Sequence, residues 1–180
     1  MHRRTLLATA FMGIAMNANA NEQLAWNFSL PNIEGGDLKF ADHKGRVILV
    51  VNTASFCGFT PQYEELQALH KSHGARGLTV IGVPSRDFNQ EYADDQAVKT
   101  FCEVTFGIDF PMTTVSHVKG TSAVPFYAWV KSQANGWEPN WNFNKVLIGR
   151  DGRIKATFGS GDRPGQGRVL AAIEAELAKD

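Results

Sequence analysis

The feature that most constrains the fold is the continuous apolar run Val47-Ile48-Leu49-Val50-Val51, because a strand that is apolar at every position is typically buried on both faces. A helix start follows it. Thr60 is a favourable N-cap, and Pro61 suits the first helical position, where its missing N–H costs nothing. The predicted helix runs over 60–73, and a second apolar run covers 78–83. A strand, a helix and a further buried strand form a βαβ unit, so we expect the two strands to be parallel.

The remaining patterns predict three more helices and two hairpins. Two short segments around 26–30 and 37–40 are separated by Gly35-Gly36 and predict an N-terminal β-hairpin, while Asp151-Gly152 marks a tight turn in a second hairpin. The strands of that second hairpin are expected at 143–149 and 153–158, and the further helices at 94–106, 122–130 and 164–178. This order predicts an α/β, thioredoxin-like fold, with a central mixed sheet flanked by helices and an added N-terminal hairpin.

The first twenty residues have the pattern of a cleavable signal peptide. A positive start with Arg3-Arg4 precedes an apolar run over 5–16, and Ala18-Asn19-Ala20 supplies small residues for cleavage. We therefore expect residues 1–20 to be removed and residues 21–180 to form a single domain in the periplasm. A buried N-terminal helix or a membrane anchor is the alternative, and the Sec and twin-arginine routes both stay open. A formal net charge of +0 gives no electrostatic support for a nucleic-acid partner.

Cys57 lies in the turn between the first core strand and the helix that follows it, and it is one of 2 cysteines in the chain. Backbone N–H groups and the macrodipole at a helix N-terminus favour a thiolate, which indicates a reactive cysteine. In open α/β sheets, sites form beyond the carboxyl ends of the strands, where the 84–90 loop also lies. The second cysteine, Cys102, is on the predicted 94–106 helix. An exported protein could hold the two as a disulfide.

Three segments together resemble the cysteine form of the glutathione peroxidase family, and the likeness extends from about residue 28 to residue 177. The segments are Val51-Asn52-Thr53-Ala54-Ser55-Phe56-Cys57-Gly58-Phe59-Thr60-Pro61-Gln62-Tyr63, Trp141-Asn142-Phe143-Asn144-Lys145 and Phe110-Pro111-Met112. The resemblance implies a thiol peroxidase that reduces hydrogen peroxide and organic hydroperoxides, takes part in the response to oxidative stress, and uses no bound cofactor or metal. The scattered histidines likewise show no metal-site spacing.

The resemblance assigns Cys57 as the nucleophile, Trp141 as an indole donor and Asn142 as an amide donor. Such donors can stabilise the oxygen that departs when a thiolate attacks an O–O bond. The family's glutamine position is occupied by Asp87. An ionised carboxylate beside Cys57 would disfavour the thiolate but could accept its proton, and Arg86 could offset the charge. Alternatively, Gln90 supplies the missing amide; by position we favour Asp87.

Cys102 resembles the resolving cysteine of family members that use thioredoxin. A Cys57 sulfenic acid would condense with Cys102 to a disulfide, and a thioredoxin-like protein or glutathione would reduce it. Because a disulfide needs Cα atoms within about 7 Å, we expect the 94–106 helix to unwind in part during turnover. The alternative is that Cys102 is a small buried hydrophobe. The chain lacks a long insertion between Phe126 and Trp141, which suggests a monomer.

Two other functions fit the same residues. One is a non-catalytic periplasmic peroxide sensor or disulfide relay, and the other is a disulfide reductase, which the absence of a Cys-x-x-Cys motif disfavours. Lys145 either keeps the site electropositive or is a solvated strand residue.

Overall fold

The computed structural model describes residues 23–179. The predicted signal peptide, residues 1–20, lies outside the described residues. Within 23–179, no helix has the length and apolar character needed to cross a membrane.

A four-stranded mixed sheet forms the centre of the molecule. Its order is β4 (Leu78–Pro84), β3 (Val47–Thr53), β5 (Lys145–Ile148) and β6 (Ile154–Phe158). Strands β3 and β4 are parallel, as the βαβ pattern predicts, and β5 is antiparallel to both of its neighbours. Every residue of β3 and β4 is buried. A separate antiparallel hairpin, β1 (Ser29–Pro31) and β2 (Asp37–Lys39), precedes the sheet. The predicted thioredoxin-like α/β fold with an N-terminal hairpin is therefore confirmed.

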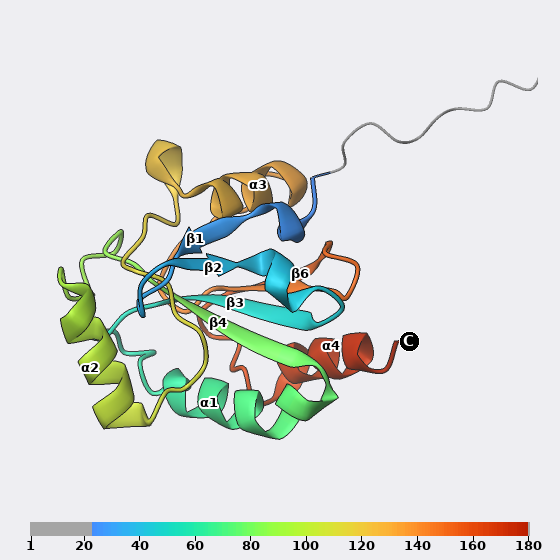
Figure 1. Ribbon diagram of the computed structural model, residues 1–180, viewed down its shortest axis with the longest axis horizontal. Helices are drawn as coiled ribbons and strands as arrows, with labels where there is room; N and C mark the ends of the chain where they lie inside the picture. Colours follow the sequence, from blue (N-terminus) through green and yellow to red (C-terminus); the bar gives the residue numbers. More distant parts are fainter. Residues whose placement is uncertain (1–22, 180) are drawn as a thin grey trace, which may run out of the picture.

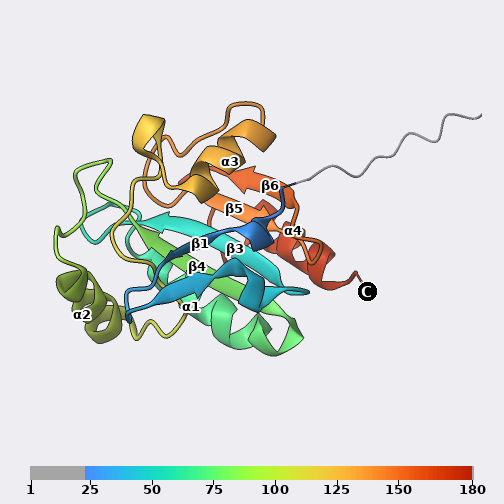
Figure 2. The ribbon, with the colours of Figure 1, turned by 45° about the horizontal axis from the view of Figure 1, so that its top comes forward.

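The helices cover both faces of the sheet (Figures 1 and 2). Helices α1 (Gln62–His73) and α4 (Gly167–Leu177) lie on one face, and α3 (Pro125–Gln133) and the N-terminal hairpin lie on the other. Alternate residues of β3 serve the two cores because successive strand side chains point to opposite faces. Leu49 belongs to the core with α1 and α4, whereas Val50 belongs to the core with the hairpin and α3.

Helix α2 (Asp95–Phe106) lies at the end of the sheet where β3 and β4 terminate (Figure 1). Asp94 caps it by accepting a hydrogen bond from the backbone N–H of Ala97, at 2.9 Å. Gly107 ends it with a positive φ of 60°, a conformation that glycine adopts without strain. Short 3₁₀ segments complete the described chain at Ala25–Asn27, Phe40–His43, Gly74–Arg76 and Gly120–Ser122.

The predicted boundaries are wrong by a few residues at three helix starts. Helix α1 begins at Gln62 rather than residue 60, α3 at Pro125 rather than 122, and α4 at Gly167 rather than 164. In each case turn or extended residues precede the first helical hydrogen bond. Before α1, these residues belong to the turn that carries Cys57.

Candidate active site

The turn that carries Cys57 is closed by the Thr60 hydroxyl. This hydroxyl accepts a hydrogen bond from the Cys57 backbone N–H at 3.0 Å and donates one to the Ala54 carbonyl at 2.8 Å. The prediction that Thr60 caps the helix is therefore wrong, because its side chain bonds backward to the turn. The thiol is free, its residue is only 7% exposed, and the Phe59 backbone N–H lies 3.4 Å from Sγ.

The segment 141–144 brings the second predicted pair to the same end of the sheet. Asn142 is fully buried, and its Nδ2 donates to Gln90 Oε1 at 2.8 Å. Gln90 is also bonded to the cysteine turn, because its backbone carbonyl accepts the Phe56 N–H at 3.0 Å. Trp141 is 40% exposed and its ring lies beside that of Phe88, with centroids 5.4 Å apart. Trp141, Asn142 and Gln90 are therefore connected around the residues that flank Cys57.

Asn52, the last but one residue of β3, holds this segment in place. Its Nδ2 donates to the Trp141 carbonyl at 3.0 Å, and its Oδ1 accepts the Asn144 N–H at 3.0 Å. Its carbonyl accepts the Phe143 N–H at 2.6 Å. Phe143 has a φ of 59°, an uncommon and strained value for a bulky residue. Sequence reasoning assigned Asn52 no role, although a buried amide that interrupts an apolar run was a usable signal.

Asp87 and Gln90 differ in what their side chains contact. The Asp87 carboxylate accepts hydrogen bonds from His117 Nδ1 at 2.6 Å and from the backbone N–H of Val118 at 2.6 Å and of Lys119 at 3.3 Å. These contacts tie it to the 117–119 segment, whereas the Gln90 amide reaches Asn142. The structure therefore brings together the Cys57 turn, Trp141, Asn142 and Gln90, and bonds Asp87 to a neighbouring loop.

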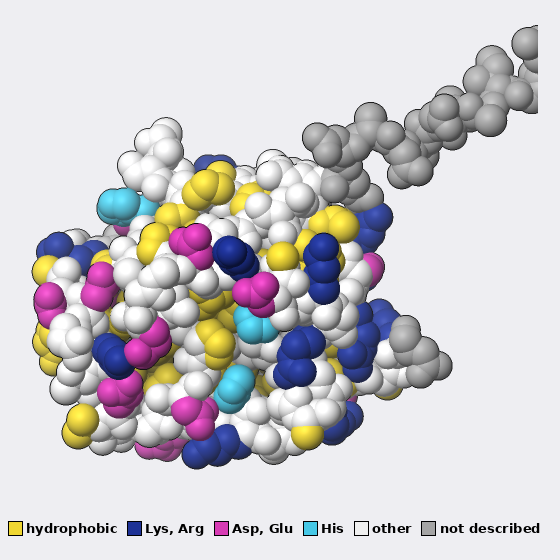
Figure 3. Space-filling model, in the orientation of Figure 1, with side chains coloured by type: hydrophobic (Ala, Val, Ile, Leu, Met, Phe, Trp, Pro, Cys, Tyr) yellow, Lys and Arg dark blue, Asp and Glu magenta, His cyan; other side chains and the backbone are white. Residues whose placement is uncertain are grey.

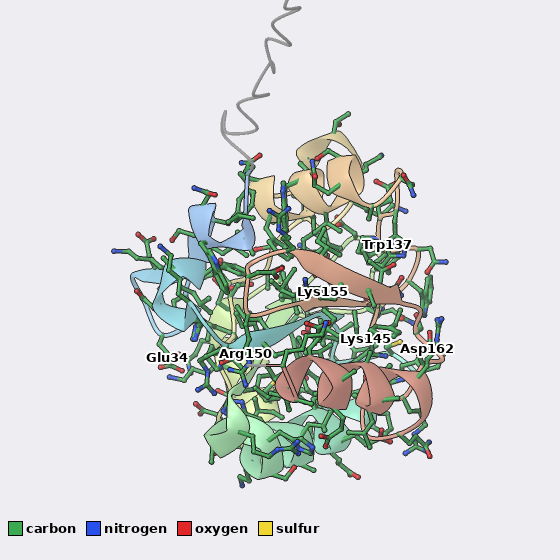
Figure 4. All side chains as sticks on the ribbon, turned by 90° about the vertical axis from the view of Figure 1, so that its right-hand side faces the viewer. Glu34, Trp137, Lys145, Arg150, Lys155 and Asp162 are labelled. Atoms are coloured by element: carbon green, nitrogen blue, oxygen red, sulfur yellow. The ribbon has the colours of Figure 1, made fainter. Side chains whose placement is uncertain are left out.

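Lys145 is buried beneath the 141–144 segment rather than solvated, so that alternative is wrong. Its Nζ donates to Gln62 Oε1 at 2.6 Å and to the Asp162 carbonyl at 2.7 Å, and Figure 4 shows Lys145 close to Asp162 near the start of α4. Burial lowers the pKa of Lys145 to about 8, although the Asp162 carboxylate opposes the shift. Gln62 then donates to the Ser160 carbonyl at 2.7 Å.

Ser160 completes this support. Its hydroxyl donates to the Asn142 carbonyl at 2.6 Å and accepts from Asn144 Nδ2 at 2.8 Å. Neither Ser160 nor Gln62 was predicted to support the site, because their partners are distant in sequence.

Cys102 faces the core from α2 and is 1% exposed. Burial raises the pKa of its thiol to about 11. Both cysteines are free, so the structure shows the dithiol state.

Aromatic side chains rim the cysteine turn. Phe56 and Phe59 are exposed large hydrophobic residues, as is Trp141. Phe56 contacts Tyr92 with ring centroids 4.5 Å apart. Acidic and basic side chains are mixed over the face drawn in Figure 3, with several acidic ones over α2. The exposed surface of the cysteine turn is therefore apolar at Phe56 and Phe59, which suits an apolar substrate or a protein surface.

Comparison with known families gives a match to the family model described as Glutathione peroxidase, over residues 25–131. Among curated proteins, the chain is 37% identical over 169 residues to the hydroperoxy fatty acid reductase gpx1 of a Synechocystis species. That alignment covers 88% of this chain and 98% of the relative. It is 40% identical over 135 residues to the glutathione peroxidase-like peroxiredoxin gpx1 of Schizosaccharomyces pombe, covering 73% and 85% of the two chains.

Solved structures show the same likeness. The crystal structure of Trgpx in apo form matches with a TM-score of 0.69 and 27% identity, over 88% of this chain and 98% of that one. A thiol:disulfide interchange protein of the thioredoxin family from Chlorobium tepidum matches with a TM-score of 0.62 at 17% identity, over 89% and 100% of the two chains. The second likeness is one of fold alone.

Proposed function

The chain belongs to the glutathione peroxidase family and is a thiol peroxidase, and from this premise we propose that it reduces hydroperoxides through a Cys57 sulfenic acid that Cys102 resolves. The observation that carries the proposal is the arrangement around Cys57. A free thiol lies in a turn whose neighbour Phe56 is bonded to Gln90, and Gln90 is bonded to Asn142.

In the first half-reaction, the Cys57 thiolate attacks the terminal oxygen of the hydroperoxide. A sulfur–oxygen bond forms, the O–O bond breaks, and the departing oxygen takes a proton to leave as an alcohol or water. The Trp141 indole N–H has no hydrogen-bond partner among residues 23–179, so it can donate to that oxygen. We assign the amide role to Gln90, because its side chain contacts Asn142 whereas the Asp87 carboxylate accepts hydrogen bonds from 117–119.

In the second half-reaction, the Cys102 thiol attacks the sulfenic sulfur of Cys57 and water leaves, which gives a disulfide. Cys102 is buried on α2, so we propose that part of α2 unwinds to deliver it. A thioredoxin-like protein or glutathione then reduces the disulfide. The peroxiredoxin name of the Schizosaccharomyces pombe relative supports a thiol reductant.

The substrate class is proposed from the rim and the relatives. Phe56 and Phe59 of the cysteine turn and Trp141 are exposed apolar side chains, and the Synechocystis relative is named a hydroperoxy fatty acid reductase. Both support organic hydroperoxides beside hydrogen peroxide. We also propose that a monomeric mature chain works in the periplasm after removal of residues 1–20.

Stopped-flow measurement of peroxide consumption by the reduced mature protein tests the proposal. We expect catalytic turnover with a thioredoxin system that is abolished in Cys57→Ser, and a much slower recycling by thioredoxin in Cys102→Ser. Side-by-side assays with glutathione identify the reductant. A slow reaction of one equivalent would indicate a sensor or relay, and a Cys102→Ser enzyme that recycles as fast as the wild type would contradict the resolving role.

The same assay distinguishes Gln90 from Asp87. We expect Gln90→Leu to lower the rate of Cys57 oxidation by about tenfold or more, since donors of this kind contribute a few kcal/mol, and Asp87→Asn to lower it by less. A larger loss of the oxidation rate in Asp87→Asn than in Gln90→Leu would assign the supporting role to Asp87 instead.

A further inference from the structure

Four buried polar atoms near the cysteine turn make no hydrogen bond of ordinary geometry within residues 23–179, although the Tyr63 hydroxyl lies within reach of Thr53 and the Ser55 side chain lies within reach of Glu91. They are Thr53 Oγ1, Ser55 Oγ, Tyr63 OH and Glu91 Oε2. Folded proteins leave few buried polar atoms unpaired, so a group of them at one place calls for an explanation. All four belong to segments that adjoin the nucleophile: the end of β3, the cysteine turn, α1 and the loop after β4.

Glu91 is the ionisable member of this group that is fixed next to the cysteine turn. Its Oε1 accepts the backbone N–H of Ser55 at 3.2 Å and that of Tyr92 at 2.8 Å, and the Ser55 side chain also lies beside the carboxyl group, without ordinary hydrogen-bond geometry to Oε2. Ser55 is two residues before Cys57. The side chain is buried, and no cation among the described residues pairs with its carboxyl group. Burial raises the pKa of Glu91, which makes its carboxylate a stronger base.

A continuous series of aromatic contacts connects this carboxyl group with the Cys102 helix. The ring of Tyr92 lies 4.5 Å from that of Phe56 and 6.0 Å from that of Phe101, between centroids. Phe101 contacts Phe106 at 5.7 Å, and Phe106 contacts Tyr63 at 5.3 Å. Residues adjacent to Cys57, Glu91 and Cys102 are thus packed together.

The Tyr63 hydroxyl lies against the Cys102 thiol and beside Thr53. The titratable groups that face this cluster are therefore Tyr63 from α1 and Cys102 with Glu103 from α2. Glu103 is on the exposed side of its helix. Glu91 is thus the one carboxyl group that is both buried with this cluster and bonded to the cysteine turn, within the part of the chain that the structure describes.

The resolving step needs a base. Burial raises the pKa of the Cys102 thiol to about 11, so the thiol is protonated at pH 7 before α2 opens and must lose its proton to react. Attack on the sulfenic sulfur by a neutral thiol is slow, since the thiolate is the nucleophile.

Resting on the proposed Cys57–Cys102 chemistry, we propose that Glu91 accepts the proton of the Cys102 thiol during disulfide formation. The Cys102 sulfur forms a bond to the Cys57 sulfur, and the sulfur–oxygen bond of the sulfenic acid breaks. The Cys102 sulfur is oxidised and the Cys57 sulfur reduced to the disulfide level. The thiol proton passes to the Glu91 carboxylate and then to the departing hydroxide, which leaves as water. The Tyr63 hydroxyl contacts the thiol before α2 opens.

The test uses Glu91→Gln in the full mature chain, because glutamine keeps the Oε1 acceptor for the Ser55 and Tyr92 N–H groups but accepts no proton. One equivalent of hydrogen peroxide is mixed with the reduced protein. Trapping with a sulfenic-acid reagent follows Cys57 oxidation, and quenched mass spectrometry follows the disulfide. We expect oxidation of Cys57 within about twofold of the wild type and disulfide formation slowed by about a hundredfold, the size of a general-base contribution. Glu103→Gln is the matched control and should leave both steps unchanged.

The pH profile of the second step separates a proton acceptor from a structural residue. In the wild type the rate should follow ionisation of a carboxyl group, and in Glu91→Gln it should rise only as the thiol itself ionises in alkaline solution. Glu91→Asp, which keeps a carboxylate, should recover part of the rate. Equal disulfide rates in wild type and Glu91→Gln, or an equal slowing of both steps in the variant, would overturn the proposal. A wild type that forms no Cys57–Cys102 disulfide would instead refute the proposed resolving role.

Discussion

Two regions near the site contain buried polar groups, the segment 141–144 with its supports and the cluster of Thr53, Ser55, Tyr63 and Glu91, yet they are bonded very differently. The 141–144 segment is held by hydrogen bonds from Asn52 and Ser160, and Lys145 beneath it is bonded to Gln62. Among the described residues there, only Asn142 Oδ1 has no hydrogen-bond partner. In the cluster, four polar atoms lack a partner of ordinary geometry within 23–179. In the proposed mechanism, the first region holds the donors that act on the O–O bond. The second faces the helix that must move if Cys102 is to reach Cys57.

This difference fits two requirements of one catalytic cycle. Donors that stabilise a developing charge work best when they are preorganised, and a fully bonded network provides that rigidity. A helix that has to release a buried thiol gains from weak polar packing beneath it, because less hydrogen bonding is lost when it opens. Substitutions in the two regions test this difference, and the largest effect is expected at Asn52.

Asn52→Ala should have the largest effect, since it removes two side-chain hydrogen bonds from a fully buried position and leaves the Asn144 N–H without its partner. We expect the free energy of unfolding to fall by about 3 kcal/mol, with a parallel loss of peroxidase rate. Urea denaturation and stopped-flow oxidation measure the two effects. The control is Asn32→Ala, which removes one bond to the Glu34 N–H in an exposed turn and should cost less than about 1 kcal/mol. Equal losses in both variants would mean that the buried hydrogen bonds of Asn52 stabilise the fold no more than the exposed bond of Asn32.

Lys145 gives a pH-dependent test of the same network. Its pKa in the folded protein is about 8, below its ordinary 10.5. Between these pH values the unfolded chain binds a proton that the folded chain does not, so stability increases with pH across the window. Relative to Lys145→Met, the wild type should therefore gain up to about 3 kcal/mol of unfolding free energy from pH 8 to pH 10.5. Cys102 titrates in both proteins and cancels in the difference. A flat difference would show that Lys145 is less buried in solution than in the structure.

The sequence predicts the fold and the main site residues because their signals are local. The run 47–51 identifies a buried strand, and the helix signals near Pro61 place Cys57 in a turn. The motif around Trp141 is recognised from its own residues by resemblance to the family. The structure brings Asn142 to the end of the sheet where that turn lies, as expected.

The remaining features depend on partners that local patterns do not reveal. Asp87 and Gln90 are close in sequence but contact different residues: backbone N–H groups at 117–119 bind the Asp87 carboxylate, whereas Gln90, after the turn at Asn89 with its φ of 56°, contacts Asn142. Thr60 bonds to Ala54 and Cys57 because the turn, rather than the helix, needs its hydroxyl. Lys145 can be buried because its ammonium group donates hydrogen bonds to the Gly159 and Asp162 carbonyls, which are distant in sequence.

The smallest effect is expected from a pair of buried threonines that differ in one bond. Thr113 Oγ1 donates to the Thr114 carbonyl at 2.8 Å, whereas Thr53 Oγ1 has no partner of ordinary geometry within 23–179. Valine has the same shape without the hydroxyl, so Thr113→Val should lower the free energy of unfolding by about 1 kcal/mol. Thr53→Val should cost less than Thr113→Val, because the Thr53 hydroxyl contacts the Tyr63 hydroxyl without ordinary hydrogen-bond geometry. Chemical denaturation of both variants measures the difference directly. If Thr53→Val costs as much as Thr113→Val, the Thr53 hydroxyl makes a full hydrogen bond in solution, and the cluster of Thr53, Ser55, Tyr63 and Glu91 is as well bonded as the segment 141–144.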